Sequence, residues 1–195
     1  MNNYEKVFKV FKSNYQLVPL EVFGTNPYKT LISTLLSSRT KEETTIKASH
    51  RLFKVAPTLS KLKNLKTKQI EKLIYPVGFY ITKAKQLRTL SNQITKVPKT
   101  QRELIDLPGV GIKTANLVLN RAFKIPAIAV DTHVHKISNL LGWVKTNTPE
   151  ETEKELSIVL PKKYWKDANR LFVSIGRQHT TKKSLMEFLK KENLN

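Results

Sequence analysis

The residues of this chain best suited to chemistry are a lysine and an aspartate, Lys113 and Asp131, each placed where a helix is predicted to begin. A lysine amine is a nucleophile that forms Schiff bases, and a nearby carboxylate stabilises positive charge and assists proton transfer. Only the neutral amine attacks, whereas the pKa of free lysine is about 10.4, and burial and a helix N-terminus both disfavour the ammonium form. The alternatives are a surface lysine and an aspartate that only caps its helix. The surrounding motif therefore has to decide between them.

A glycine hairpin directly precedes Lys113, in a run over 107–115 that reads LPGVGIKTA. Glycine adopts positive φ without a steric penalty, so Gly109 and Gly111 permit a turn too tight for other residues. The exposed amides of Gly109, Val110 and Gly111 then converge at the N-terminus of the next helix, where the dipole is positive. The hairpin therefore predicts an anion-binding site beside the amine.

The elements that must position these residues are predicted to be helices. Thr100 and Glu103 have the spacing of a capping box, and apolar residues recur at near-helical spacing after the hairpin, which predicts a helix–hairpin–helix motif at about 101–124. A first helix carries Tyr4, Val7, Phe8 and Phe11 on one face, and caps at Asn26 and Thr148 open two more. Other helices are predicted at 42–56, 67–75, 80–96, 132–141, 162–175 and 181–191. The predicted fold class is all-α.

Composition restricts the class of partner. The formal net charge is +20 over 195 residues, a field that attracts polyanions but confers no sequence specificity; a generically basic protein is the alternative. The absence of cysteine excludes disulfides, zinc sites with thiolate ligands and iron–sulfur ligation. His133 and His135 do not share a helix face, so no metal site is predicted. No apolar stretch approaches membrane-spanning length, and a cytoplasmic, DNA-associated location is expected.

The stretch from Leu107 to Trp143 resembles the helix–hairpin–helix DNA glycosylase superfamily, and is most similar to its endonuclease III family. The resemblance extends from about Pro27 to about Gly176. It includes the runs LLSSRTK at 35–41, VGFY at 77–80, PEETE at 149–153 and Leu160-Pro161.

The resemblance implies an architecture of two helical lobes with a DNA-binding cleft between them. The central lobe would span 24–127 and contain the helix–hairpin–helix motif, while 1–23 and 128–195 would form a second, discontinuous lobe. The implied partner is double-stranded DNA with a damaged base or an abasic site. A monomer is expected, with no membrane association.

The implied activity is that of a bifunctional DNA glycosylase and abasic-site lyase of base excision repair that removes oxidised pyrimidines. Lys113 and Asp131 stand at the family's catalytic positions. Breaking the bond from C1′ to the base gives the sugar oxocarbenium character, and a lysine Schiff base then permits β-elimination of the 3′ phosphate, whereas water would stop at base removal. Two alternatives stay open: a uracil or thymine mismatch glycosylase, and a non-catalytic helix–hairpin–helix DNA-binding protein.

Extruding a nucleotide from the duplex leaves a gap that a side chain must fill. Arg39 and Phe79 match the family's DNA-inserting positions, where glutamine and an aliphatic residue are common. Phe79, followed by the basic Lys83, suits a wedge that intercalates, with core packing as the alternative. Because arginine can hydrogen-bond to guanine, Arg39 is predicted to shift the opposite-base preference.

The largest departure from the family is the missing iron–sulfur cluster. Most relatives end in four cysteines that hold the cluster, and here His179 stands about where the first would be. The cluster is therefore predicted to be absent and no other prosthetic group is expected, while a monovalent cation at the hairpin carbonyls is left open by the resemblance. The tail lysines are predicted either to replace lost phosphate contacts or to form a solvated helix face: Lys182, Lys183, Lys190 and Lys191.

Overall fold

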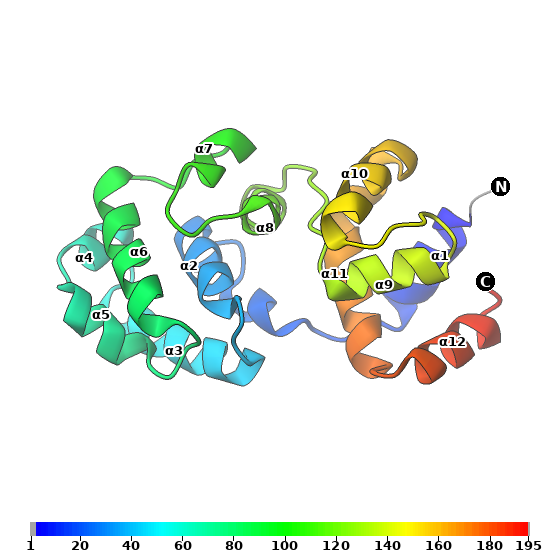
Figure 1. Cartoon of the computed structure of the whole chain (residues 1–195), viewed down its shortest axis with the longest axis horizontal. Helices are drawn as coiled ribbons and strands as arrows, with labels where there is room; N and C mark the ends of the chain where they lie inside the picture. Colours follow the sequence, from blue (N-terminus) through cyan, green and yellow to red (C-terminus); the bar gives the residue numbers. More distant parts are fainter. Residues whose placement is uncertain (1–2, 195) are drawn as a thin grey trace. The chain divides into compact units, whose positions relative to one another are not determined.

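The computed structural model describes residues 3–194, which form helices joined by turns (Figure 1). The chain divides into two compact units: unit 1 consists of Met1–Val18 and Ile125–Asn195, and unit 2 of Pro19–Lys124. Within the described residues there are twelve α-helices, two 3-10 helices and no strand, so the all-α prediction is confirmed. None of these helices has the length and apolar character needed to cross a bilayer.

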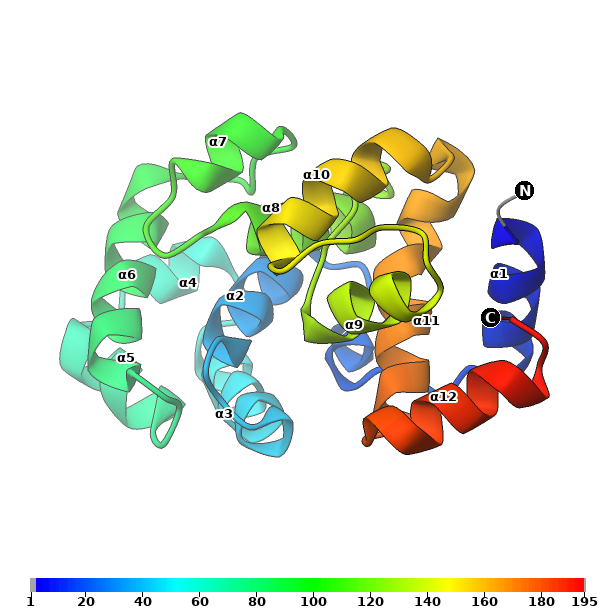
Figure 2. The same ribbon diagram turned by 45° about the vertical axis from the view of Figure 1, so that its right-hand side comes forward.

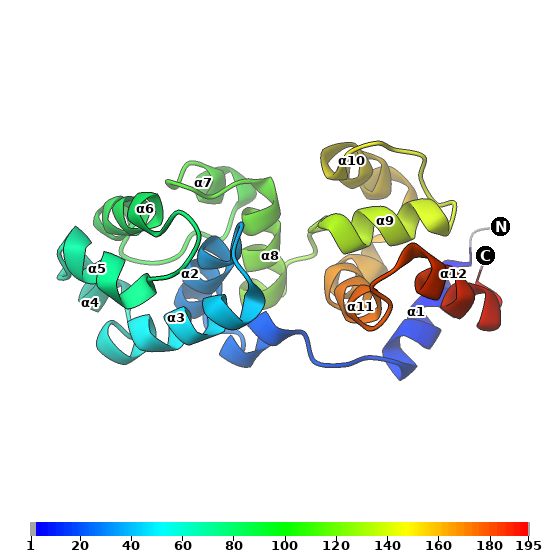
Figure 3. The same cartoon turned by 60° about the horizontal axis from the view of Figure 1, so that its bottom comes forward.

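Unit 2 is built around helix α2, which contacts α3, α6 and α8 (Figure 3). The sequence explains this central place, because an apolar stripe runs along α2, with Leu31, Ile32 and Leu36 fully buried. Small polar side chains, those of Thr30, Ser33 and Thr34, occupy the other buried positions, so most of the helix circumference is covered. Asn26 begins α2 as predicted, its side chain accepting a hydrogen bond from the Lys29 N–H at 3.0 Å. The helices of unit 2 are η1 (Pro19–Phe23), α2 (Pro27–Ser37), α3 (Glu42–Val55), α4 (Leu59–Lys63), α5 (Thr67–Ile74), α6 (Tyr80–Gln93), α7 (Gln101–Ile105) and α8 (Ile112–Phe123).

The outer part of unit 2 is formed by α4, α5 and α6, which lie side by side (Figure 1). Their contact is apolar, and Ile70, Leu87 and Leu90 are fully buried there. The five-residue helices η1 and α4 were not predicted, because an element that short has no measurable apolar period.

Unit 1 is centred on α11, which contacts α1 and α9, while α10 packs on α9 (Figure 2). Its helices are α1 (Tyr4–Ser13), α9 (Thr132–Leu140), α10 (Pro149–Val159), η2 (Lys162–Tyr164), α11 (Trp165–Gln178) and α12 (Lys182–Lys191). The single helix predicted at 162–175 is thus a 3-10 turn followed by a longer α-helix. Thr148 caps α10 as predicted, its hydroxyl accepting from the Glu151 N–H at 3.2 Å.

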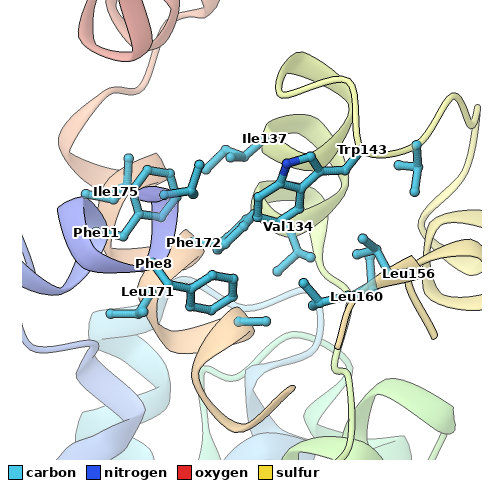
Figure 4. Close-up of a cluster of buried hydrophobic side chains, with 14 of the residues drawn as sticks. Phe8, Phe11, Val134, Ile137, Trp143, Leu156, Leu160, Leu171, Phe172 and Ile175 are labelled. Carbon is cyan, nitrogen blue, oxygen red and sulfur yellow. The ribbon is translucent and has the colours of Figure 1, made fainter. Parts of the chain in front are cut away.

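The core of unit 1 combines aliphatic and aromatic side chains, and it is called the aromatic core below because Phe8, Phe11, Trp143 and Phe172 meet in it (Figure 4). Phe11 meets Phe172 edge-on with ring centroids 5.1 Å apart, and Phe8 stacks parallel to Trp143 at 6.1 Å. The indole N–H of Trp143 donates to Asn3 Oδ1 at 3.1 Å, so its polar atom is satisfied inside the core. Burial of each such side chain contributes about 1.5–3 kcal/mol, which fixes α1 on α11 although the two are far apart in the sequence.

The boundaries between the units differ from those predicted, which were at 24 and 127. Unit 2 begins at Pro19 because η1 packs on α2 and α3, with the Phe23 ring edge-on to Phe53 at 5.3 Å. Unit 2 ends at Lys124, which closes α8 in the left-handed conformation at φ +59°.

Candidate active site

In the hairpin between α7 and α8, the first glycine has the positive φ that was predicted. Gly109 has φ +78°, so its backbone conformation favours glycine. A Cβ added there would lie 2.6 Å from Gln86 Oε1, so the end of that flexible side chain would have to move. Val110 is buried and donates its N–H to the Leu107 carbonyl at 3.1 Å. Its amide therefore closes the turn, and the structure revises the prediction that this amide contacts DNA.

The second glycine works differently. Gly111 is the N-cap of α8 with φ −93° and ψ 175°, an extended backbone that any residue adopts, so the predicted need for positive φ is wrong here. Nothing lies within 4 Å of a Cβ added at Gly111, and no side chain caps α8. The first N–H groups of α8 therefore face a bare surface, where an anion can approach them and the positive end of the helix dipole.

Lys113 is the second residue of α8 and is exposed. Its position in the first turn of α8 agrees with the prediction. No hydrogen bond or ion pair engages its amine within residues 3–194. The amine is thus accessible.

Asp131 is the N-cap of α9 in unit 1, as predicted. Its Oδ1 accepts hydrogen bonds from the N–H groups of His133 at 3.0 Å and Val134 at 2.9 Å. Both bonds go to one oxygen, so Oδ2 is not used by the cap. The carboxylate therefore lies at the N-terminal end of α9, where the first backbone amides of the helix point.

The segment that leads to Asp131 is held on unit 1 by side chains that the sequence did not single out. Ile128 and Val130 are buried in the aromatic core, and the buried side chain of Asn169 donates to the Ala129 carbonyl at 3.0 Å. Asn169 lies on α11, forty positions along the chain, so no local pattern indicates this contact. A rigid segment therefore carries the carboxylate.

The two histidines after Asp131 point to different neighbours. His133 lies against the bare backbone of α11, where a Cβ added at Gly176 would be 2.1 Å from His133 Nδ1. His135 Nδ1 instead lies 2.6 Å from Thr152 Oγ1 on α10. Within the described residues, no group of three or more acidic, histidine or cysteine side chains is placed to hold a metal ion.

Arg39 and Phe79 form one exposed pair on unit 2. The Arg39 guanidinium lies over the Phe79 ring at 5.6 Å from its centroid, and Phe79 is 61% exposed. Core packing of Phe79 is thereby excluded. Both residues have positive φ, +48° and +58°, in a region that costs a residue with a side chain ~1–2 kcal/mol.

Lys83, by contrast, is buried, and burial lowers its pKa to about 8. Its ammonium donates to the carbonyls of Leu36 at 2.9 Å and Ser38 at 2.5 Å, and to Thr40 Oγ1 at 3.2 Å. These bonds use all three donors of the ammonium. The structure therefore revises the predicted direct contact of Lys83 with DNA, because no donor is left for a phosphate.

A cavity of about 270 Å³ opens on unit 2 beside the Arg39–Phe79 pair. It is lined by Leu35, Ser38, Arg39, Phe79, Thr82, Lys83, Gln86 and Gly109. Four predicted site residues, Arg39, Phe79, Lys83 and Gly109, are thus brought together in one place. Gln86 is an addition; its spacing of three from Lys83 on α6 was the only signal that could have indicated it.

The tail of unit 1 does not fit the iron–sulfur cluster that the resemblance implies. The chain has no cysteine to bind iron, and the His179 ring stacks on Phe188 at 4.5 Å with its Nδ1 3.1 Å from Ser184 Oγ. Helix α12 instead places Leu185 and Leu189 in the aromatic core. The four tail lysines, Lys182, Lys183, Lys190 and Lys191, are exposed on this helix.

Comparison with known proteins agrees with this geometry. The family model described as HhH-GPD superfamily base excision DNA repair protein matches residues 32–162. The chain is similar to endonuclease III of Thermotoga maritima, at 48% identity over 159 residues that cover 79% of this chain and 75% of the relative.

Two solved structures are similar in both sequence and fold. One is a trapped covalent endonuclease III–DNA intermediate in an estranged-adenine complex, with TM-score 0.75 and 34% identity over 80% of this chain and 76% of the other. The second is a non-covalent endonuclease III–DNA complex, with TM-score 0.80 and 30% identity over 93% of this chain and 89% of the other.

Proposed function

The chain belongs to the HhH-GPD superfamily of base excision DNA repair proteins and, within it, to the endonuclease III family, and from this premise we propose how its residues divide the chemistry. The protein is a DNA glycosylase with abasic-site lyase activity, and its partner is DNA. Lys113 and the DNA-gripping hairpin come from unit 2, whereas Asp131 comes from unit 1.

Lys113 is the nucleophile of the reaction. Its neutral amine attacks C1′ as the bond from C1′ to the base breaks, and the base leaves with a proton. After the sugar ring opens, the nitrogen and C1′ form a Schiff base that acidifies the C2′ proton. Loss of that proton expels the 3′ phosphate by β-elimination, and water then releases the amine. The accessible, unpaired amine in the first turn of α8 is the observation that carries this proposal.

Asp131 stabilises the positive charge that develops on the sugar and assists proton transfer to and from the amine. Two properties support this role: the carboxylate is fixed by two hydrogen bonds to Oδ1, and Oδ2 is not used by the cap. A carboxylate that is already oriented costs less reorganisation when charge develops.

The hairpin and the exposed pair grip the DNA. The uncapped amides at the start of α8 bind a backbone phosphate, and the extruded nucleotide leaves a gap that Arg39 and Phe79 fill together. Arg39 also reads the orphaned partner base, and a preference for guanine follows from its paired donors. Replacing Arg39 by glutamine should change the ratio of excision opposite guanine to excision opposite adenine.

The substrate class we assign is an oxidised pyrimidine, and the competing assignment is uracil or thymine in a mismatch. The proposal includes a monomeric enzyme that works without a prosthetic group. The absence of cysteine and the packing of α12 support the part of this proposal that concerns the iron–sulfur cluster. A monovalent cation at the hairpin carbonyls stays a prediction.

The test uses end-labelled duplexes that carry thymine glycol, uracil or a preformed abasic site. Wild-type protein should excise thymine glycol and nick the strand, whereas Lys113→Gln should lose both activities by roughly 10³-fold or more. The matched control is Lys54→Gln, which removes the same charge from an exposed position on α3 and should nick normally. Faster excision of uracil would favour the mismatch enzyme, and binding without nicking would favour a non-catalytic protein.

A further inference from the structure

We propose that Lys83 is a positioning residue that ties the turn carrying Arg39 to the turn carrying Phe79, so that the two side chains act as one wedge. The role of the wedge in DNA rests on the proposed function, but the hydrogen bonds that form the tie belong to unit 2 and do not depend on it. Neither residue of the wedge touches Lys83 through its own side-chain hydrogen bonds; the lysine acts on the backbone beneath them.

The first half of the tie is the end of α2. Lys83 Nζ donates to the Leu36 carbonyl at 2.9 Å and to the Ser38 carbonyl at 2.5 Å. These carbonyls belong to the last turn of α2 and the residue after it, where the helix has no further amides to offer. The ammonium therefore fixes the backbone immediately before Arg39.

The second half runs through Thr40. Its hydroxyl accepts from Lys83 Nζ at 3.2 Å and from the Gly78 N–H at 3.1 Å, and donates to the Ser38 carbonyl at 3.0 Å. One oxygen thus connects the lysine, the turn after α2 and the turn before α6. Gly78 makes this approach possible, because a Cβ there would lie 2.3 Å from the Arg39 carbonyl oxygen.

The backbone beneath the wedge needs such a tie. Arg39 at φ +48° and Phe79 at φ +58° both hold a conformation that side chains disfavour, and Phe79 is 61% exposed, so the ring gains little from the core. Strained residues persist only where their surroundings fix them. Here the fixing atoms are the Lys83 ammonium and the Thr40 hydroxyl on one side and the Arg39–Phe79 contact at 5.6 Å on the other.

A purely structural role for Lys83 is the competing explanation, since the lysine also caps α2. The two roles make different predictions. Loss of a helix cap lowers the thermal stability and reduces the excision and nicking rates by the same factor. Loss of the tie instead impairs the extrusion of the nucleotide, which is the step that needs the wedge. Excision of a paired base needs that step more than cleavage at an abasic site, because an abasic site has no base to unpair or unstack.

The decisive variant is Lys83→Met, with Lys85→Met as the matched control, because Lys85 is an exposed lysine two positions along the same helix. Single-turnover rates are measured on a thymine glycol duplex and on an abasic duplex. Lys83→Met should lower the excision rate by roughly 10- to 100-fold and the abasic nicking rate by much less, and Lys85→Met should leave the ratio of the two rates unchanged. A Lys83→Met protein with an unchanged ratio would overturn the proposal, whatever its melting temperature.

A second variant protects the test against misfolding. Thr40→Val removes the shared hydroxyl while keeping the volume, so it should change the ratio in the same direction as Lys83→Met. In the double variant the two effects should not add, because both remove the same connection. Additive effects would show two independent contributions and contradict a tie through Thr40.

Hydrogen exchange separates failure of this inference from failure of the proposed function. The Gly78 amide donates to Thr40 Oγ1, so it should exchange faster in Lys83→Met and in Thr40→Val than in the wild type. If wild-type protein neither traps nor nicks abasic DNA, the proposed function fails, and exchange at Gly78 still decides whether the tie exists. Unchanged protection at Gly78 in both variants would overturn the tie itself.

Discussion

Helices α8 and α9 begin in opposite ways. The N-terminus of α8 has glycine at its cap position, no side-chain hydrogen bond to its first amides and an exposed lysine in its first turn. The N-terminus of α9 is closed by Asp131, whose Oδ1 accepts from two backbone amides. One helix keeps its donors free, and the other uses them on its own side chain.

Under the proposed function, this difference between the two helix N-termini matches two tasks in one reaction. A phosphate can be gripped only by donors that the protein has left unused, so the start of α8 has to remain open and less stable than it could be. A carboxylate that must stay ionised and oriented benefits from being the cap itself. The N-terminus of α8 thus lacks the stabilisation of a side-chain cap, whereas the cap at Asp131 stabilises the N-terminus of α9.

The largest effect should come from removing the charge of Asp131 while keeping its cap. Asparagine caps a helix about as well as aspartate, so Asp131→Asn should fold with an almost unchanged melting temperature. Without the carboxylate, the single-turnover excision rate should fall by roughly 10²- to 10⁴-fold. A variant that retains wild-type rates would mean that Asp131 only caps α9. The difference between the N-termini of α8 and α9 would then be structural and not catalytic.

The next effect comes from closing α8. Gly111→Ser and Gly111→Asp both introduce a capping group, and the space around Gly111 accommodates a side chain. Each should raise stability by a few tenths of a kcal/mol, because glycine is already a fair cap. Affinity for duplex DNA should fall, by about tenfold for aspartate and by less for serine, since aspartate also repels phosphate. Binding titrations at two salt concentrations measure this, and undiminished affinity in both variants would show that these amides do not bind phosphate.

A smaller effect, on stability, should distinguish the capping role of Asp131 from the role of its charge. Asp131→Ala removes both, so it should be less stable than Asp131→Asn by about 1 kcal/mol. Thermal denaturation of the two variants measures the difference as a shift of a few degrees. Equal melting temperatures would indicate that the two hydrogen bonds to Oδ1 add no stability.

The smallest effect concerns acid stability at the start of α11, where Asp167 pairs with Arg170 at 2.8 Å and with Lys12 on α1 at 3.2 Å. Partial burial alone would raise the pKa of the Asp167 carboxyl, but its hydrogen bonds and charge pairing with Arg170 and Lys12 outweigh this and lower that pKa. The pairing therefore stabilises the protein above the ordinary aspartate pKa, and the contribution is lost as the pH falls through the lowered value. The free energy of unfolding, measured with denaturant, should be larger for the wild type than for Asp167→Asn at pH 7. The two values should converge near pH 2. A constant difference would contradict the lowered pKa.

Local features of the site could be predicted from the sequence because they depend on neighbouring residues. The caps at Asn26, Asp131 and Thr148 and the turn at Gly109 are each set by residues within four positions, and their predicted conformations are confirmed. The conformation of Gly111 was predicted wrongly because a Gly-x-Gly pair does not specify which glycine takes positive φ.

Long-range features could not be predicted, because they depend on which elements meet in space. Lys83 and Lys113 are both lysines near helix N-termini, yet Lys83 is buried against the end of α2 and Lys113 is exposed. Which way a lysine points depends on the packing of α6 on α2, and no local pattern contains that information. The same holds for Asn169, whose partner lies forty positions away.

The role of Lys113 is decided by identifying the amine that bonds to the sugar. Wild-type protein is incubated with an abasic duplex and borohydride, the adduct is digested with a protease, and the modified peptide is sequenced by mass spectrometry. One modified residue, Lys113, is expected. Modification of any other lysine, or of the N-terminal amine, in a protein that still nicks the strand would contradict it.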